Sequence, residues 1–119
     1  MGLANDQGRK GEDLAVNALE MKGFAILERN YRFERNEVDI IALRDGLLVF
    51  AEVKSRGNTS VLKPESFLTP VQAERIKKAA WAFLQEYQFM SIPARFDVFA
   101  ISFDDPQCPE ILHFEDAFR

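Results

Sequence analysis

The sequence predicts an α/β domain in which a mixed β-sheet is flanked by helices. Three observations lead to this prediction: a helical apolar repeat near the N-terminus, two β-rich runs joined by a tight turn, and a second helical repeat with a strong start signal. The predicted order is helix, three strands, helix, and then one or two strands. The 119 residues are 47% hydrophobic and 29% charged, which predicts one ordinary globular domain over residues 1–119.

The first predicted helix covers residues 8–22 and ends before Gly23, which suits the position that follows a helix. Glu12 lies on the inward stripe of this helix, one turn before the apolar residues that define it. An acid there is either a first-turn residue favoured by the helix dipole or a carboxylate directed at a functional site. Residues 24–33 then predict a strand.

Residues 37–54 predict a β-hairpin, because Asp45-Gly46 separates two β-rich runs and favours a two-residue turn of type I′. Directly opposed side chains of such a hairpin share a face, with Cβ atoms roughly 5 Å apart. The turn therefore predicts two opposed pairs near the open end of the hairpin, Asp39 with Glu52 and Glu37 with Lys54.

Both faces of this hairpin are apolar, which predicts central strands that are covered on both sides. The face with Asp39 and Glu52 is predicted to carry Ile41, Leu43, Leu48 and Phe50. The opposite face is predicted to carry Val38, Ile40, Ala42, Leu47, Val49, Ala51 and Val53.

The opposed acids Asp39 and Glu52 repel each other, so the sheet requires something that offsets their charge. A divalent cation is the simplest candidate, and with Lys54 beside the acids it predicts a metal-dependent site for phosphodiester cleavage. The alternative is a structural ion pair at the end of the sheet, in which Lys54 binds Glu37 or Glu52.

Residues 55–68 predict a long irregular loop next to Lys54. Thr69-Pro70 then predicts a helix that runs to about residue 88. Gln72 lies on its buried stripe, where the amide either contacts a ligand or bonds to the backbone at the helix end. Residues 95–103 and 111–114 predict two further strands, the second of them a short edge strand.

The net charge is −4, with 19 acids and 15 bases, which argues against broad, non-specific nucleic-acid binding. Local basic groups nevertheless flank the acidic pair in the sequence, and they either contact phosphates or are solvated surface charges. They are Arg29, Arg32 and Arg35 before it, and Lys54, Arg56 and Lys63 after it.

Other features narrow the function class. The single cysteine, Cys108, excludes an internal disulfide, argues against a thiol-based metal site and favours a reducing, cytoplasmic location. No signal peptide and no apolar stretch of the ~18 residues needed to span a membrane is found, so no membrane association is expected. The only histidine, His113, lies in an apolar run and is interpreted as structural, which leaves zinc-hydrolase motifs without support.

The order of these residues resembles the PD-(D/E)xK nuclease superfamily, and most closely its small bacterial YraN-type proteins, whose fold is similar to archaeal Holliday-junction resolvases. The matching segments span nearly the whole chain. They are Gly8-x-x-Gly-Glu12, Arg29-Asn30-Tyr31-Arg32, Glu37-Val-Asp39-Ile-Ile-Ala42, Val49-Phe-Ala-Glu-Val-Lys-Ser-Arg56 and Arg95-Phe-Asp97. Ala51 and Asn36 replace the usual Val and Gly, Gln72 stands where Lys is also common, and Asp97 is interpreted as structural.

The resemblance implies a restriction-endonuclease-like fold and a role for each matching residue. Asp39 and Glu52 would bind Mg²⁺ or Mn²⁺, with the Val53 carbonyl as a further ligand and Glu12 completing the acidic cluster. Lys54 would orient the attacking water and stabilise charge on the phosphate, and Gln72 matches the superfamily's fourth motif.

The leading hypothesis is therefore a metal-dependent endonuclease that acts on branched or flapped DNA, a substrate preference that rests on analogy of fold. Cutting two strands symmetrically with one site per chain implies a homodimer. One alternative is a nucleic-acid-binding module with little or no cleavage activity, and another is an adaptor whose acids bind a structural cation.

Overall fold

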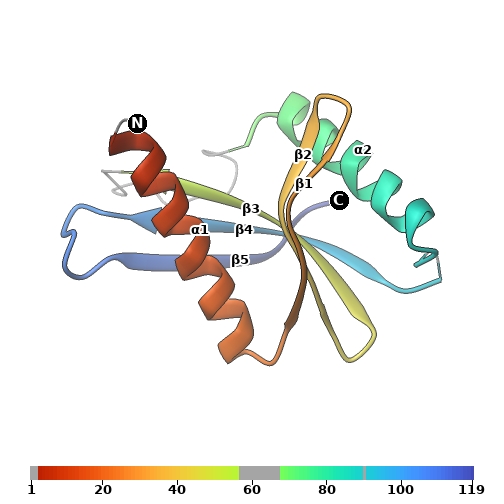
Figure 1. Ribbon diagram of the computed structural model, residues 1–119, viewed down its shortest axis with the longest axis horizontal. Helices are drawn as coiled ribbons and strands as arrows, with labels where there is room; N and C mark the ends of the chain where they lie inside the picture. Colours follow the sequence, from red (N-terminus) through yellow and green to blue (C-terminus); the bar gives the residue numbers. More distant parts are fainter. Residues whose placement is uncertain (1–2, 57–67, 90) are drawn as a thin grey trace.

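The computed structural model describes residues 3–56, 68–89 and 91–119 and has the predicted order of elements (Figure 1). The elements are α1 (Leu3–Met21), β1 (Ala25–Phe33), β2 (Asn36–Arg44), β3 (Leu47–Arg56), α2 (Pro70–Glu86), β4 (Ala94–Ser102) and β5 (Glu110–Phe118). The strands form one sheet in sequence order, antiparallel throughout except for the parallel pair of β3 and β4. The mixed α/β fold class predicted from the sequence is thus confirmed.

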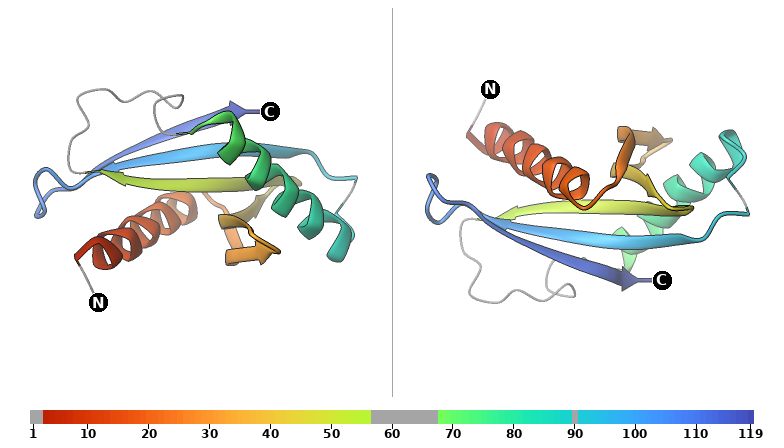
Figure 2. Two further views of the ribbon diagram at one scale, coloured as in Figure 1. Left: turned by 90° about the horizontal axis from the view of Figure 1, so that it is seen from above. Right: turned by 90° about the horizontal axis from the view of Figure 1, so that it is seen from below.

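The two helices cover opposite faces of the sheet (Figure 2). Ala15 and Leu19 of α1 pack on one face, against a cluster that includes Ile40 and Phe99. Four buried residues of α2 pack on the other face, where Phe83 meets Phe50 and Tyr31 edge-to-face. No helix among the described residues is long and apolar enough to cross a membrane.

Local signals explain where the elements begin and end. Thr69 is the N-cap of α2, and Gln72 closes a capping box with it. Helix α1 begins five residues earlier than predicted and ends before Gly23, whose φ of 92° is easily adopted only by glycine. Strand β5 is an edge strand, as predicted, but with nine residues it is longer than expected.

The hairpin of β2 and β3 has the predicted turn and register. Asp45 and Gly46 both have positive φ, at 50° and 77°, as a type I′ turn requires. The paired residues run from Arg44 opposite Leu47 to Ile40 opposite Ala51, and there the pairing ends. Beyond this point β2 turns away with β1, while β3 continues beside β4 (Figure 1).

This divergence corrects one predicted face. Val38 was expected on the same face as Ile40, but it packs in the cluster beneath α2 with Ile41. The reason is that β2, still paired with β1, turns away from β3 beyond Ile40, so the same side of the strand meets a different helix at Val38. The other predicted faces of the hairpin are confirmed.

Asp97 on β4 is fully buried and has a complete set of partners. Arg95 binds both of its oxygens at 2.8 Å, and the Asp116 N–H donates to Oδ1 at 3.0 Å. His113 Nε2 lies 2.7 Å from Oδ2, while Lys22 Nζ donates to Nδ1 of the same ring. Because the lysine ammonium has only donors, Nε2 carries the proton and donates it to Asp97. This network is what the structural interpretation of Asp97 and His113 predicts.

Candidate metal and phosphate site

Asp39 and Glu52 lie at the fork where β2 separates from β3. They are the next opposed positions after the last paired residues, Ile40 and Ala51, and their carboxyl groups lie close enough for Asp39 to raise the pKa of Glu52. Asp39 Oδ2 also accepts the Val53 N–H at 2.8 Å. The side chain of Asp39 thus accepts a backbone N–H of β3 at the point where the backbone pairing of the two strands ends.

The electrostatics of the fork favour an added positive charge. Burial, the hydrogen bond to Asp39 and the charge of Asp39 raise the pKa of Glu52 to about 9, against a partial opposing effect of Lys54. Burial and the charge of Asp39 also raise the pKa of Glu37, although Arg32 binds its Oε2 at 3.0 Å. At neutral pH the pair of Asp39 and Glu52 therefore holds a proton, which a cation would displace.

Lys54 lies next to the acids on the same face of β3 as Glu52. Its Nζ is 3.9 Å from Glu52 Oε1, so the two form a loose ion pair that leaves donors of the ammonium available to other groups. The Oε1 atom of Gln72 accepts the Thr69 N–H at 3.1 Å, which is the backbone role that the sequence left open. Gln72 nevertheless lines the same cleft as Lys54.

Glu12 of α1 lines the same cleft as Asp39 and Glu52, but its carboxylate is bound elsewhere. Its Oε1 accepts hydrogen bonds from Arg29 Nε at 2.8 Å and from Asn30 Nδ2 at 3.0 Å. Within residues 3–56, 68–89 and 91–119, no three His, Cys, Asp or Glu side chains are arranged to hold a metal ion. Glu37 lines this cleft too, but Arg32 binds its Oε2, so Asp39 and Glu52 are the two facing carboxylates left for a cation. The ligand roles of Glu12 and of the Val53 carbonyl stay predictions.

Three adjoining clefts surround the fork. The acid cleft has a volume of about 410 Å³. Because one water molecule occupies about 30 Å³, the cleft has space for a phosphate group and several waters. It shares Glu12 and Asn30 with the arginine cleft, and Glu37 and Glu52 with the lysine cleft. The linings are Gly8, Glu12, Asn30, Glu37, Asp39, Glu52, Val53 and Ser55 (acid cleft), Arg9, Glu12, Asp13, Arg29, Asn30 and Arg32 (arginine cleft), and Arg35, Glu37, Glu52, Lys54, Gln72, Arg75 and Ile76 (lysine cleft).

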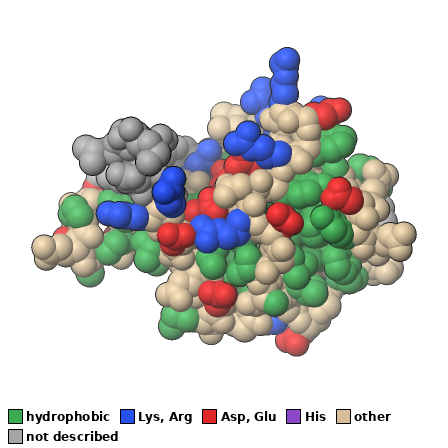
Figure 3. All heavy atoms as spheres, in the orientation of Figure 1, with side chains coloured by type: hydrophobic (Ala, Val, Ile, Leu, Met, Phe, Trp, Pro, Cys, Tyr) green, Lys and Arg blue, Asp and Glu red, His purple; other side chains and the backbone are tan. Residues whose placement is uncertain are grey.

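Basic side chains therefore flank the acids on both sides, which is the arrangement that a phosphate backbone crossing the fork would need. In Figure 3, Lys and Arg side chains gather over the upper part of one face, with acids among them. Of the predicted phosphate contacts, Arg29 and Arg32 line the arginine cleft and Arg35 the lysine cleft. The side chain of Arg56 and the whole of Lys63 lie outside the described residues.

Two residues of the site were not singled out by sequence reasoning. Asn30 has a left-handed φ of 55° inside β1, and this conformation brings its amide to Glu12. Gly11 allows α1 to approach β3, because a Cβ there would collide with the Ser55 hydroxyl. Both residues lie in segments that match the family, Gly8-x-x-Gly-Glu12 and Arg29-Asn30-Tyr31-Arg32. Their place in these segments was the feature of the sequence that could have identified them.

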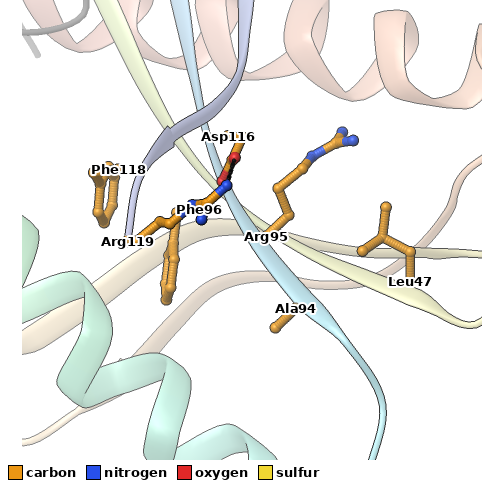
Figure 4. A pocket seen from close by; sticks show the side chains of 7 residues that line it. All are labelled: Leu47, Ala94, Arg95, Phe96, Asp116, Phe118 and Arg119. Carbon is orange, nitrogen blue, oxygen red and sulfur yellow. Dashed lines mark hydrogen bonds and ion pairs between the residues drawn. The ribbon is translucent and has the colours of Figure 1, made fainter.

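A further cleft lies at the opposite end of β3 and β4, where Arg95, Phe96 and Phe118 line it (Figure 4). Its charged groups already have partners, since Arg95 binds Asp97, and Arg119 binds Asp116 at 2.8 Å. It holds no pair of facing acids, so the fork is the better candidate for chemistry.

Comparison with known proteins identifies the family of the chain. A family sequence model, described as "Uncharacterised protein family UPF0102", matches residues 11–101 of this chain. The chain is 46% identical over 113 residues to a UPF0102 protein of Geotalea uraniireducens, covering 94% of this chain and 88% of the relative. It is 40% identical over 118 residues to one of Christiangramia forsetii, covering 99% and 98%. The chain belongs to the UPF0102 family, which confirms the predicted YraN-type kinship.

Proposed function

We propose that this protein is a metal-dependent endonuclease that hydrolyses phosphodiester bonds in DNA. The observation that carries the proposal is the fork, where Asp39 and Glu52 face each other beside Lys54, between two clefts lined by arginines. Buried like charges are costly in a sheet, and a cation is the ligand that would relieve that cost.

The donor atoms of the fork fit Mg²⁺ or Mn²⁺. Both are oxygen-binding cations, and Mg²⁺ keeps several waters and takes one or two carboxylates, which is the number that converges here. When bound, such a cation lowers the pKa of a water molecule and neutralises charge on a phosphate. The chain offers no second histidine and no cysteine pair that would favour zinc instead.

The roles of the chain's own residues follow from their positions. Lys54 has ammonium donors available to hold a phosphate oxygen as negative charge develops on it. Arg9, Arg29 and Arg32 on one side, and Arg35 and Arg75 on the other, provide contacts for the phosphates that flank the scissile bond. The acidic net charge of −4 suits a protein that binds through such local contacts rather than through a broad basic surface.

Resemblance to the PD-(D/E)xK superfamily extends the proposal to branched or flapped DNA as substrate, and to a homodimer as the form that cuts both strands. The cytoplasmic location predicted from the cysteine content belongs to the same proposal. Family membership is consistent with this reading, since the matched residues 11–101 include Glu12, Asp39, Glu52 and Lys54.

A nucleic-acid-binding module without cleavage activity is the second candidate. The observation that favours it is the engagement of Glu12 by Arg29 and Asn30, which leaves two converging carboxylates among the described residues. In this case the clefts would hold the phosphate backbone while the acids play no chemical part.

The test is cleavage of labelled linear, flapped and four-way-junction DNA with Mg²⁺ or Mn²⁺. Asp39→Asn should lower the rate by about 100-fold or more, because it removes one of the two charges that would bind the cation. Asp45→Asn is the matched control, since it removes the same charge from the exposed turn of the same hairpin.

Equal rates for wild type and Asp39→Asn would overturn the nuclease proposal. Binding of DNA without metal-dependent cutting would establish the binding module. Neither binding nor cutting, together with metal-dependent stability, would point to the adaptor with a structural cation.

A further inference from the structure

Arg29 holds two neighbouring carboxylates of α1 at once. Its Nε donates to Glu12 Oε1 at 2.8 Å, and its Nη2 donates to Asp13 Oδ1 at 2.7 Å. The hydrogen bonds to both acids are what raise the pKa of the guanidinium. Arg29 is nonetheless 38% exposed, so an anion from solution can reach the guanidinium and compete for its donors.

Glu12, one of the two acids that Arg29 binds, lines two clefts. Glu12 lines the arginine cleft together with Arg29, and it also lines the acid cleft together with Asp39 and Glu52. Its side chain is only 14% exposed, so a different rotamer would direct the carboxylate into the acid cleft rather than into bulk water. Asn30, whose backbone is in the left-handed conformation, is the second group that holds it in the observed position.

We propose that Arg29 couples the binding of a phosphate group to the binding of a divalent cation, an inference that rests on the proposed function. A phosphate in the arginine cleft competes with Glu12 for the guanidinium, because arginine binds phosphate through two parallel charge-assisted hydrogen bonds. Glu12 is then released toward Asp39 and Glu52 and adds a third carboxylate to the cation site. Arg29 is a positioning residue in this scheme.

Coupling of this kind is reciprocal, so each ligand raises the affinity for the other by the same factor. The chain without nucleic acid holds the cation weakly, with two carboxylates, and the chain with a phosphate backbone in place holds it tightly, with three. Metal would thus be recruited fully only when substrate is present.

The first test measures Mn²⁺ binding to the whole chain without nucleic acid, from the paramagnetic resonance signal of unbound Mn²⁺. Arg29→Met should bind Mn²⁺ about fivefold or more tightly than wild type, because Glu12 is no longer held away. Arg9→Met is the control for simple loss of positive charge, since Arg9 lines the same cleft and forms no ion pair with the described acids. The Mn²⁺ affinity of Arg29→Met should exceed that of Arg9→Met, and this difference should vanish when Glu12→Gln is added to Arg29→Met.

The second test measures the affinity of a labelled single-stranded DNA oligonucleotide by fluorescence anisotropy, with and without Ca²⁺ at constant ionic strength. Ca²⁺ is used because it also takes carboxylate oxygens. It should tighten DNA binding about fivefold or more in wild type, and by a smaller factor in Arg29→Met. Equal factors in wild type and Arg29→Met, or equal Mn²⁺ affinities of Arg29→Met and Arg9→Met in the first test, would overturn the coupling.

The two proposals fail in distinguishable ways. If wild type binds no Mn²⁺, or binds it equally well after Asp39→Asn, the cation site and the proposed function both fall. If Mn²⁺ binding depends on Asp39, but the Mn²⁺ affinity of Arg29→Met rises no more than that of Arg9→Met, only the coupling through Arg29 is wrong.

Discussion

Asp97 and Glu52 are carboxylates on neighbouring central strands, and their surroundings are opposite. Burial alone would raise the pKa of Asp97, but hydrogen bonds from His113, Arg95 and the Asp116 N–H together lower it. Burial also raises the pKa of Glu52, and its nearest carboxylate neighbour, Asp39, raises it further, to about 9. The same sheet thus contains one acid whose charge is fully matched and one whose charge is opposed.

This contrast separates the acid that stabilises the fold from the acid that is available to a ligand. A buried acid with a full set of partners rigidifies its surroundings and has no capacity left for another cation. A buried pair of like charges lowers stability, and it persists in structures where a bound ligand or a reaction makes use of it. Substitutions at the two acids, and at an exposed acid of the same hairpin, test this contrast.

Asp97→Asn should destabilise the protein by about 3–5 kcal/mol, because Asp97 is fully buried and the amide N–H group of asparagine would face the donors of Arg95, His113 or the Asp116 backbone. Urea unfolding measures this free energy. Glu52→Gln, the matched change at the fork, should leave stability unchanged or raise it in metal-free buffer. A loss of similar size in both variants would contradict the contrast between the two acids.

Local signals explain how much of this could be predicted from the sequence. The turn at Asp45-Gly46 and the cap at Thr69 depend on neighbouring residues, and both were confirmed with the fold class. The opposed positions of Asp39 and Glu52 follow from the same turn, because a register counted from a two-residue loop needs no other information.

What could not be predicted depends on contacts between distant segments. The hold of Arg29 on Glu12 joins α1 to β1, and the partners of Asp97 come from β4 and β5. No periodicity encodes which of several nearby charges a long side chain selects. The predicted face of Val38 was wrong for a related reason. Alternation along β2 was counted past the point where β2 and β3 separate.

Adding Mn²⁺ should stabilise the native protein by about 2.7 kcal/mol when its concentration is 100 times the dissociation constant. The reason is that the cation binds the folded fork and not the unfolded chain. Thermal or urea unfolding with and without EDTA measures the effect, and Asp39→Asn should abolish it. Stabilisation that survives in Asp39→Asn would place the cation elsewhere.

The stability of the metal-free protein should fall as pH rises from about 5 to 8. The pKa of Glu52 is raised in the folded state from 4.5 to about 9, so above pH 4.5 the unfolded chain releases a proton that the folded chain keeps until about pH 9. The stabilisation from this proton is therefore full below pH 4.5 and is lost as pH rises toward 9. One proton gives a slope of at most about 1.4 kcal/mol per pH unit. Urea unfolding across this range should show a shallower slope in Glu52→Gln and in wild type with Mn²⁺. Equal slopes in wild type and Glu52→Gln would contradict the raised pKa.

Asp45→Asn should have the smallest effect of all, within about 0.5 kcal/mol of wild type. Asn tolerates the left-handed φ of 50° at this position, and Asn-Gly favours the same type I′ turn as Asp-Gly. The charge removed is exposed at the closed end of the hairpin, whereas Asp39 and Glu52 lie half-buried at its open end. Unchanged unfolding free energy, pH slope and Mn²⁺ response in Asp45→Asn would show that those effects arise from burial and opposition at the fork, and not from any acid of the hairpin. A loss of the Mn²⁺ response in Asp45→Asn would mean that the total charge of the hairpin, rather than the fork, attracts the cation.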